Sequence, residues 1–253
     1  RGCRLALADI DHEGLDRVAA STGIAADRIS LHHLDVCDAQ AIAAFPDAVR
    51  LAHGGAALLF NNAGVAVGGR FEDVSEADFD WLMSINFWGV VRMTRAFLPM
   101  LREPDQAQIT NISSLFGLVA PAGQTAYSAS KFAVRGFSDS LRHELAGTSV
   151  GVTTVHPGGI RTSIAKNARH AANADPAELA RGQEAFDKFL VMPPEQAAAI
   201  ILRGVARRRP RVLVGRDAHF MALVERLLPA HYWSLVGRNA SAEQPAVERG
   251  TRS

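Results

Sequence analysis

Short apolar segments alternate with helix-length segments along this chain, and that alternation constrains the fold more than any other feature of the sequence. The apolar segments of strand length are 3–10, 29–36, 57–61, 108–113, 150–156 and 211–215. The segments with apolar residues at helical spacing are 11–22, 38–53, 75–102, 125–145 and 194–208. Because parallel strands need crossover connections, this order indicates a parallel sheet covered on both faces. We therefore expect an α/β fold, with one domain over residues 1–253 built on a doubly wound parallel sheet.

Composition excludes several classes of protein. Apolar residues make up 48% of the chain and 27 basic residues balance 26 acidic ones, which excludes a disordered chain and a surface that binds polyanions over its whole extent. No apolar stretch approaches the ~20 residues of a membrane-spanning helix, so we expect no span. Two cysteines, Cys3 and Cys37, do not form a disulfide framework. We expect buried thiols and a reducing, cytoplasmic compartment.

Two polar runs have plain interpretations. The basic run at 207–211 falls at a predicted helix end, where positive charge complements the helix dipole, so we expect no nucleic-acid partner. The pair His32 and His33 has no cysteine or acid at ligand spacing, so we expect no metal.

The residues that end the predicted strands are the first candidates for a site, because open parallel sheets bind ligands beyond the carboxyl ends of their strands. Asp9 ends the first predicted strand. In a dinucleotide-binding sheet an acid there would bind the adenosine ribose, and the alternative is an ordinary helix N-cap. Gly64, in the Asn-Asn-Ala-Gly turn at 61–64, would let the backbone approach a ligand closely, or is simply a turn glycine.

The sharper signal is the pair Tyr127 and Lys131, which share one face of a predicted helix at i and i+4. An ammonium beside a phenol favours the phenolate, so the pair can act as a base. Two tyrosines and three lysines placed at random would give this spacing roughly 0.02 times per chain. The alternative is a surface pair, and the context argues against it, because Ser114 ends a strand thirteen residues earlier and can face the phenol across the crevice.

Together these motifs resemble the short-chain dehydrogenase/reductase family from residue 3 to about residue 162. The resemblance implies a Rossmann-type fold in which Tyr127 exchanges a proton with the substrate oxygen and Ser114 orients that oxygen. Lys131 would hold the nicotinamide ribose and lower the Tyr127 pKa, while Asn86 would anchor a water that relays protons, with a buried helix-kink asparagine as the alternative. The resemblance implies these cofactor-binding residues: Asp9, Asp35, Val36, Asn62, Ala63, Gly64, Tyr127, Lys131, Pro157, Gly158, Ile160 and Thr162.

One departure from the family pattern is large. Members begin with a strand and a glycine-rich turn before the segment that matches 3–10, and this sequence has neither, since Gly2 and Gly14 do not lie between a strand and a helix in the required order. We expect an N-terminally truncated chain whose natural form carries roughly 25–35 more residues, the length of a strand-turn-helix unit. The alternative is a catalytically inert binding or scaffold protein of the same fold.

The resulting hypothesis is an NAD-dependent oxidoreductase that acts on a secondary alcohol or ketone. Asp9 has no adjoining Arg or Lys to neutralise a 2′-phosphate, so we expect NAD rather than NADP. Apolar residues around Ser114 and in the long connection 160–193, the expected substrate lid, favour a lipophilic substrate. The amphipathic segment 217–237 is expected to pack on the lid or on another subunit. The apolar helices 75–102 and 125–145 and the resemblance imply a homodimer or homotetramer.

Overall fold

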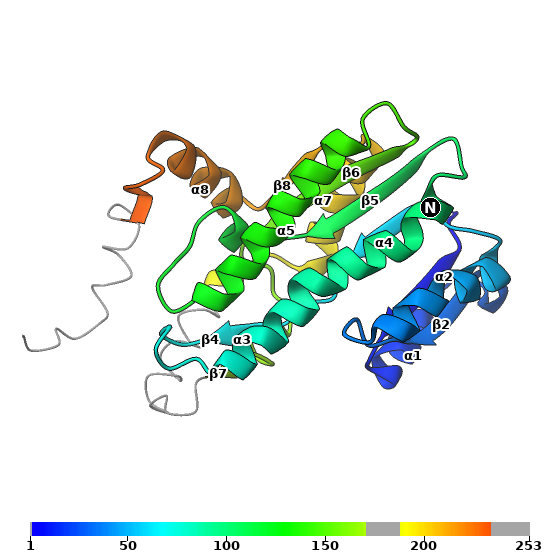
Figure 1. The fold of residues 1–253 in the computed structure, drawn as a ribbon, viewed down its shortest axis with the longest axis horizontal. Helices are drawn as coiled ribbons and strands as arrows, with labels where there is room; N and C mark the ends of the chain where they lie inside the picture. Colours follow the sequence, from blue (N-terminus) through cyan, green and yellow to red (C-terminus); the bar gives the residue numbers. More distant parts are fainter. Residues whose placement is uncertain (1, 171–187, 234–253) are drawn as a thin grey trace, which may run out of the picture.

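Six parallel strands form the centre of the molecule, and the computed structural model describes residues 2–170 and 188–233 of it (Figure 1). One pair of strands is β1 (Leu5–Asp9) and β2 (Ile29–His33). The other four, in the order β3-β5-β6-β8, are β3 (Leu58–Asn61), β5 (Ala107–Ile112), β6 (Val150–Pro157) and β8 (Arg211–Val214). Every pairing among these strands is parallel, which confirms the predicted fold class.

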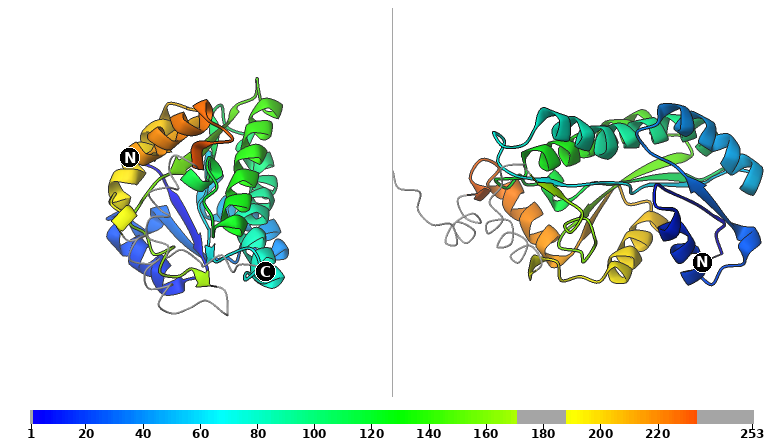
Figure 2. Two further views of the ribbon diagram at one scale, coloured as in Figure 1. Left: turned by 90° about the vertical axis from the view of Figure 1, so that its left-hand side faces the viewer. Right: turned by 90° about the horizontal axis from the view of Figure 1, so that it is seen from below.

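Helices cover both faces of the strands (Figure 2). On one face lie α2 (Ala39–His53), α4 (Val90–Leu101) and α5 (Thr125–Glu144). On the other lie α1 (His12–Ser21), α7 (Pro194–Ala206) and α8 (Arg216–Leu227). The predicted boundaries of α2 are confirmed, because the Asp38 side chain caps its start and Gly54, in a left-handed conformation with φ 82°, ends it.

The two faces bury separate apolar clusters. Ile42, Phe97, Ile109 and Val152 belong to the cluster between the strands and the helices α2, α4 and α5. On β6, Val155 points to the face opposite Val152, where it packs with Val212 and Val214 of β8 and with α7. This alternation places apolar side chains on both faces of each central strand, as a buried parallel sheet requires.

The long apolar helix expected at 75–102 forms, with one irregularity. Ser75 caps it by accepting the Asp78 N–H, and the chain then runs through α3 (Glu76–Met83), the π-helical turn η2 (Ser84–Gly89) and α4. The π turn contains Asn86, whose side chain is fully buried. A π turn shifts the helix by one residue, and such turns are frequent at functional sites.

The strands form two separate groups rather than one continuous sheet. The parallel pair β1-β2 and the four-stranded sheet are separate, and no described residue pairs with the edges of β1 and β3 that face each other. On β3, Leu58 is 45% exposed and Phe60 39% exposed, whereas Leu59 on the other face is buried. Apolar surface is thus uncovered on one side of β3.

Beyond β8 the chain returns to the loop after β5. Met221 and Ala218 of α8 pack with Leu115, Leu118 and Val119. Tyr232 Oη accepts the Ala120 N–H at 2.9 Å. The expected amphipathic segment 217–237 therefore packs, as far as residue 233, on the loop that follows β5, and residues 234–237 lie outside the described part.

Two other expectations concern side chains and spans. Cys3 and Cys37 are free, but Cys3 is exposed rather than buried because it precedes β1 at the edge of the fold. Within the described ranges, no helix has both the length and the apolar character needed to cross a membrane.

Candidate active site

A pocket of about 440 Å³ opens at the carboxyl ends of β3, β5 and β6. It brings together nine of the predicted site residues, namely Asn62, Gly64, Ser114, Tyr127, Lys131, Pro157, Gly158, Ile160 and Thr162. These residues come from three strand ends and one helix that are far apart in the sequence. Their convergence is what the parallel sheet was expected to produce.

Ser114 and Tyr127 meet in this pocket. Ser114 ends β5 and caps the short turn η3 (Leu115–Gly117), where its Oγ accepts the Phe116 N–H at 3.1 Å. Tyr127 lies in the first turn of α5, and its side chain is hydrogen-bonded to Ser114. Phe116 packs edge-on against the Tyr127 ring with centroids 6.1 Å apart. The hydroxyl and the phenol are therefore adjacent, as expected.

Lys131 lies one turn further along α5, and its side chain is buried. Its Nζ donates to the Ile112 carbonyl at 3.2 Å and lies 5.6 Å from the centre of the Tyr127 ring. Burial lowers the Lys131 pKa to about 8. The ammonium thus lies over the face of the ring.

The Tyr127 pKa is shifted in the direction opposite to the one expected from the sequence. Burial raises the Tyr127 pKa, and the hydrogen bond with Ser114 offsets part of that increase. In this arrangement Tyr127 keeps its proton at neutral pH, as a proton donor requires. A lowering of the Tyr127 pKa by Lys131 stays a prediction for the cofactor-bound enzyme.

Asn86 fixes the backbone next to the pocket rather than lining it. Its Oδ1 accepts the Val65 N–H at 2.8 Å, and its Nδ2 donates to the Val65 carbonyl at 3.0 Å and to Ser130 Oγ at 3.1 Å. Ser130 in turn donates to the Tyr127 carbonyl at 2.7 Å. The side chain therefore ties the segment after Gly64 to α5, and its expected role in proton relay stays a prediction.

Gly64 provides space that a side chain would fill. A Cβ at this position would lie 3.3 Å from Asn86 Oδ1 and 3.4 Å from Lys131 Nζ. The lack of a Cβ leaves the Lys131 ammonium accessible from the pocket, where it can bind a ribose hydroxyl. The nicotinamide half of a dinucleotide therefore fits the residues present.

Four predicted cofactor residues do not line this pocket: Asp9, Asp35, Val36 and Ala63. Asp9 is exposed at the end of β1, and its carboxylate accepts the Asp11 N–H at 3.1 Å. The alternative that Asp9 caps a helix is wrong, because Asp11 caps α1. Asp35 likewise accepts the Cys37 N–H at 2.8 Å. Contact of these residues with a cofactor stays a prediction.

Two polar groups that the sequence analysis missed, one half-buried and one buried, support the strand ends. Asp217 of α8 accepts the Gly159 N–H at 2.7 Å. The fully buried His156 donates from Nδ1 to the Ser114 carbonyl at 2.9 Å, and burial lowers its pKa to about 4, which keeps it neutral. The sequence signal that could have identified His156 is its position at a strand end, directly before Pro157.

The first half of α7 was also missed as part of the pocket. Pro194, Ala197, Ala198 and Ile201 form one wall, and Gln124 adds a polar group at the start of α5. The sequence showed α7 only as a covering helix, since its small residues carry no chemical signal.

The described parts of the expected lid 160–193 are held at both ends. Ile160 pairs with Met192, and β7 (Arg169–His170) pairs with β4 (Val67–Gly68). The Arg169 guanidinium stacks on Trp81 at 3.5 Å and binds Asp78 at 2.9 Å. Of the apolar side chains in the lid, Phe189 and Leu190 line the pocket and Met192 does not, while Phe186 lies outside the described residues.

Residues 2–170 and 188–233 contain no group of three or more His, Cys, Asp or Glu side chains that could hold a metal ion. His32 instead binds Ser30 Oγ at 2.7 Å. The polar side chains that line the pocket include those of Ser114, Tyr127 and Lys131.

Comparison with known proteins gives consistent matches. The sequence model of a family described as short chain dehydrogenase matches residues 1–173. The putative oxidoreductase SadH of Mycobacterium tuberculosis is 41% identical over 236 residues, which cover 92% of this chain and 84% of SadH.

Two solved structures resemble this one closely. A short chain dehydrogenase/reductase from Burkholderia phymatum in complex with NAD has a TM-score of 0.74 at 27% identity, covering 99% of this chain and 89% of the other. The closed form of a serine dehydrogenase complexed with NADP⁺ has a TM-score of 0.72 at 27% identity, covering 84% of each chain.

The buried Lys131 should be directly observable by NMR, because the chain has only three lysines. With ¹³Cε-labelled lysine, one of three signals should titrate near pH 8, because burial destabilises the charged form. That signal should be missing from the spectrum of Lys131→Met, while the Lys166 and Lys188 signals serve as internal references. If the Lys131 signal titrates above pH 10, the ammonium is not desolvated as described.

Proposed function

The chain belongs to the short-chain dehydrogenase family of oxidoreductases, and we propose that it interconverts a lipophilic secondary alcohol and its ketone with NAD as cofactor. The observation that carries this proposal is the pocket that joins Ser114, Tyr127 and Lys131 beneath apolar walls. A nicotinamide cofactor fits the family and the solved relatives, one of which is complexed with NAD and another with NADP⁺.

The proposed mechanism gives each side chain one task. When bound, the cofactor supplies or accepts hydride at its nicotinamide ring. In the reductive direction Tyr127 donates its proton to the substrate oxygen, and its raised pKa keeps that proton available at neutral pH. The Ser114 hydroxyl donates to the same oxygen and orients it. Lys131 binds the nicotinamide ribose from the Gly64 side.

The substrate class follows from the walls of the pocket. Leu115, Phe116, Ile164, Phe189 and Leu190 surround the polar groups, and none of these side chains can hydrogen-bond. A sugar or a phosphorylated substrate would leave its polar groups unpaired there. A lipophilic alcohol or ketone buries apolar surface instead.

We also propose that the enzyme acts as a homodimer or homotetramer in the cytoplasm. On the helices α3 to α5, the large apolar side chains of Trp88 and Phe132 are 48% and 38% exposed. Such side chains are stabilised by burial against a second copy. A reducing compartment would keep Cys3 and Cys37 as thiols.

Replacing Tyr127 with Phe should reduce kcat by at least about a hundredfold, because the ring packing stays while the proton donor is lost. NADH affinity should remain within a few-fold, measured by fluorescence titration. Tyr232→Phe is the matched control, since it removes the only other tyrosine hydroxyl, and the Ala120 N–H that it leaves is exposed to water. If Tyr127→Phe keeps more than about a tenth of wild-type kcat, Tyr127 is not the proton donor.

Asp9 should determine the preference for NAD. Its exposed carboxylate at the end of β1 would bind a ribose 2′-hydroxyl and repel a 2′-phosphate. Arg17 does not compensate, because it pairs with Asp11 and Glu13. Asp9→Asn should lower the ratio of kcat/KM for NAD to that for NADP by about tenfold or more.

Asp16→Asn is the control for Asp9, because it removes the same charge from an exposed position on α1. It should leave the cofactor ratio unchanged. Equal kcat/KM values for the two cofactors in the unmodified enzyme would contradict the assigned role of Asp9.

The pyrophosphate of the cofactor requires a further element. We propose that a parallel strand followed by a glycine-rich turn fills the gap between β1 and β3. The support is the two unpaired strand edges and the exposed side chains of Leu58 and Phe60. Each unpaired backbone group left buried in such a gap would cost roughly 1–3 kcal/mol.

Expression with and without the upstream reading frame tests this element. Residues 1–253 alone should be insoluble or should not bind NAD, whereas a chain extended by roughly 25–35 residues should fold cooperatively and bind it. Calorimetric titration and thermal unfolding measure both properties. A cooperatively folding 1–253 chain that binds NAD would contradict the proposal.

A further inference from the structure

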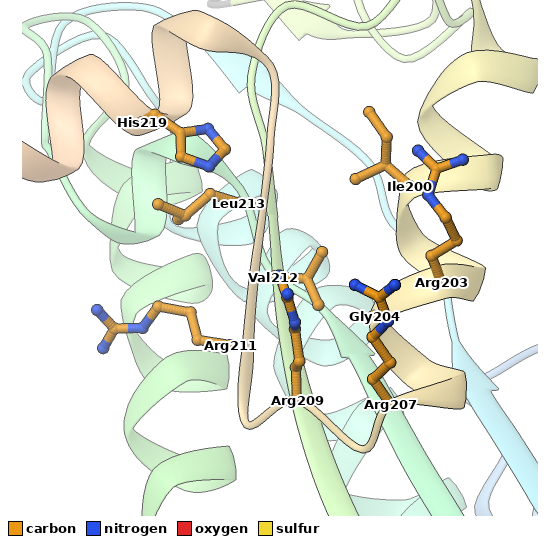
Figure 3. Close-up of a pocket in the computed structure, with 9 residues that line it drawn as sticks. All are labelled: Ile200, Arg203, Gly204, Arg207, Arg209, Arg211, Val212, Leu213 and His219. Atoms are coloured by element: carbon orange, nitrogen blue, oxygen red, sulfur yellow. The ribbon is translucent and has the colours of Figure 1, made fainter.

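A second pocket, of about 400 Å³, lies between the last turns of α7, β8 and the start of α8 (Figure 3). It shares no described lining residue with the candidate active site. The described residues around it are Ile200, Arg203, Gly204, Arg207, Arg209, Arg211, Val212, Leu213 and His219.

This pocket carries positive charge that no neighbour neutralises. Four of its described lining residues are arginines, and none is acidic. Elsewhere in the described chain, Arg50, Arg142 and Arg169 each bind a carboxylate at 2.5 to 2.9 Å. The guanidinium groups of Arg203, Arg207, Arg209 and Arg211 form no ion pair or hydrogen bond with a described residue. The negative end of α7 supplies only about half a charge to offset them.

Three of the four arginines are placed to act together. Arg203 and Arg207 are four residues apart at the end of α7, and Arg209 lies in the turn before β8. Figure 3 shows the side chains of Arg203, Arg207 and Arg209 extending in the same direction, with Arg211 turned to the other side of the strand.

Arg208 divides the basic run. Its guanidinium donates to the Ala107 carbonyl at 3.2 Å and to the Ser149 carbonyl at 2.9 Å, so this arginine is structural. The arginines of the run 207–211 therefore do not share one role. Arg208 binds the turn to the sheet, whereas the guanidinium groups of Arg207, Arg209 and Arg211 have no such partner among the described residues.

Gly204 gives the pocket its apolar floor. A Cβ there would lie 2.3 Å from Val212 Cγ2, so α7 approaches β8 as closely as it does only because position 204 has no side chain. Ile200 and Val212 then form an apolar surface beside Arg203, Arg207 and Arg209, whereas Leu213 lies with Arg211 on the other side of β8 (Figure 3). Charged groups above an apolar floor suit an organic molecule that carries a charged end.

We propose that this pocket binds a small organic molecule bearing a di- or triphosphate group. Three neighbouring guanidinium groups repel each other, and a ligand with several negative charges relieves that repulsion where one carboxylate would not. Arginine binds phosphate oxygens through two parallel N–H groups, which favours phosphate over other anions. The site is independent of the proposed oxidoreductase chemistry.

Calorimetric titration with inorganic tripolyphosphate tests the site. Arg207→Gln combined with Arg209→Gln should weaken the Kd at least about tenfold, because two of three converging charges are lost. Both side chains are exposed, so thermal unfolding should be unchanged. Arg95→Gln combined with Arg102→Gln is the matched control, since it removes two exposed arginines at α4 on the opposite face of the sheet. This control should bind as the wild type does.

Titration with ATP shows whether the organic group of the ligand adds to the binding of its phosphates. A tighter Kd than that of tripolyphosphate assigns the organic half to the floor at Ile200 and Val212, and an equal Kd assigns recognition to the phosphates alone. The first result supports the proposal, and the second contradicts the part of it that places an organic group on the floor. A double variant that binds within twofold of the wild type, or a control that loses as much affinity, would overturn the proposal.

Discussion

The polar contacts between β5 and α5 are the constraint on which the candidate site depends. Ser113 Oγ donates to the Lys131 carbonyl at 2.8 Å, Asn111 Nδ2 donates to Ser138 Oγ at 2.9 Å, and Lys131 Nζ donates to the Ile112 carbonyl at 3.2 Å. All three donors are buried side chains, so each broken bond would leave a polar group unpaired at a cost of about 1–3 kcal/mol. A shift of α5 by one residue would break them together. The register that brings Tyr127 to Ser114 is therefore fixed from within the core.

The same contacts determine the electrostatics of the site. To reach the Ile112 carbonyl, Lys131 must leave water, which lowers its pKa to about 8. Tyr127 shares this environment, which raises its pKa. Beneath both, His156 stays neutral and holds the Ser114 carbonyl. The groups to which the proposed mechanism assigns the proton transfer are thus desolvated, as is usual at functional sites.

Much of this fold could be predicted because its signals are local. Apolar periodicity located the strands and helices, and helical spacing placed Tyr127 and Lys131 on one face. Features that depend on long-range packing could not be predicted. Asp217 contacts Gly159 across 58 residues of sequence. The π turn at Asn86 leaves no mark on periodicity.

Helix α7 connects the two pockets physically. Its first turns place Ala197 and Ile201 in the wall of the candidate active site, and its last turns place Arg203 and Arg207 at the arginine pocket. A helix of 13 residues is rigid over that distance, and the contact between Gly204 and Val212 allows it almost no inward movement. Because α7 also packs on Val155 and Val214, any ligand that tilts it at one end must repack this cluster. The two pockets therefore share α7 as a wall, and a substitution that displaces this helix would alter both of them.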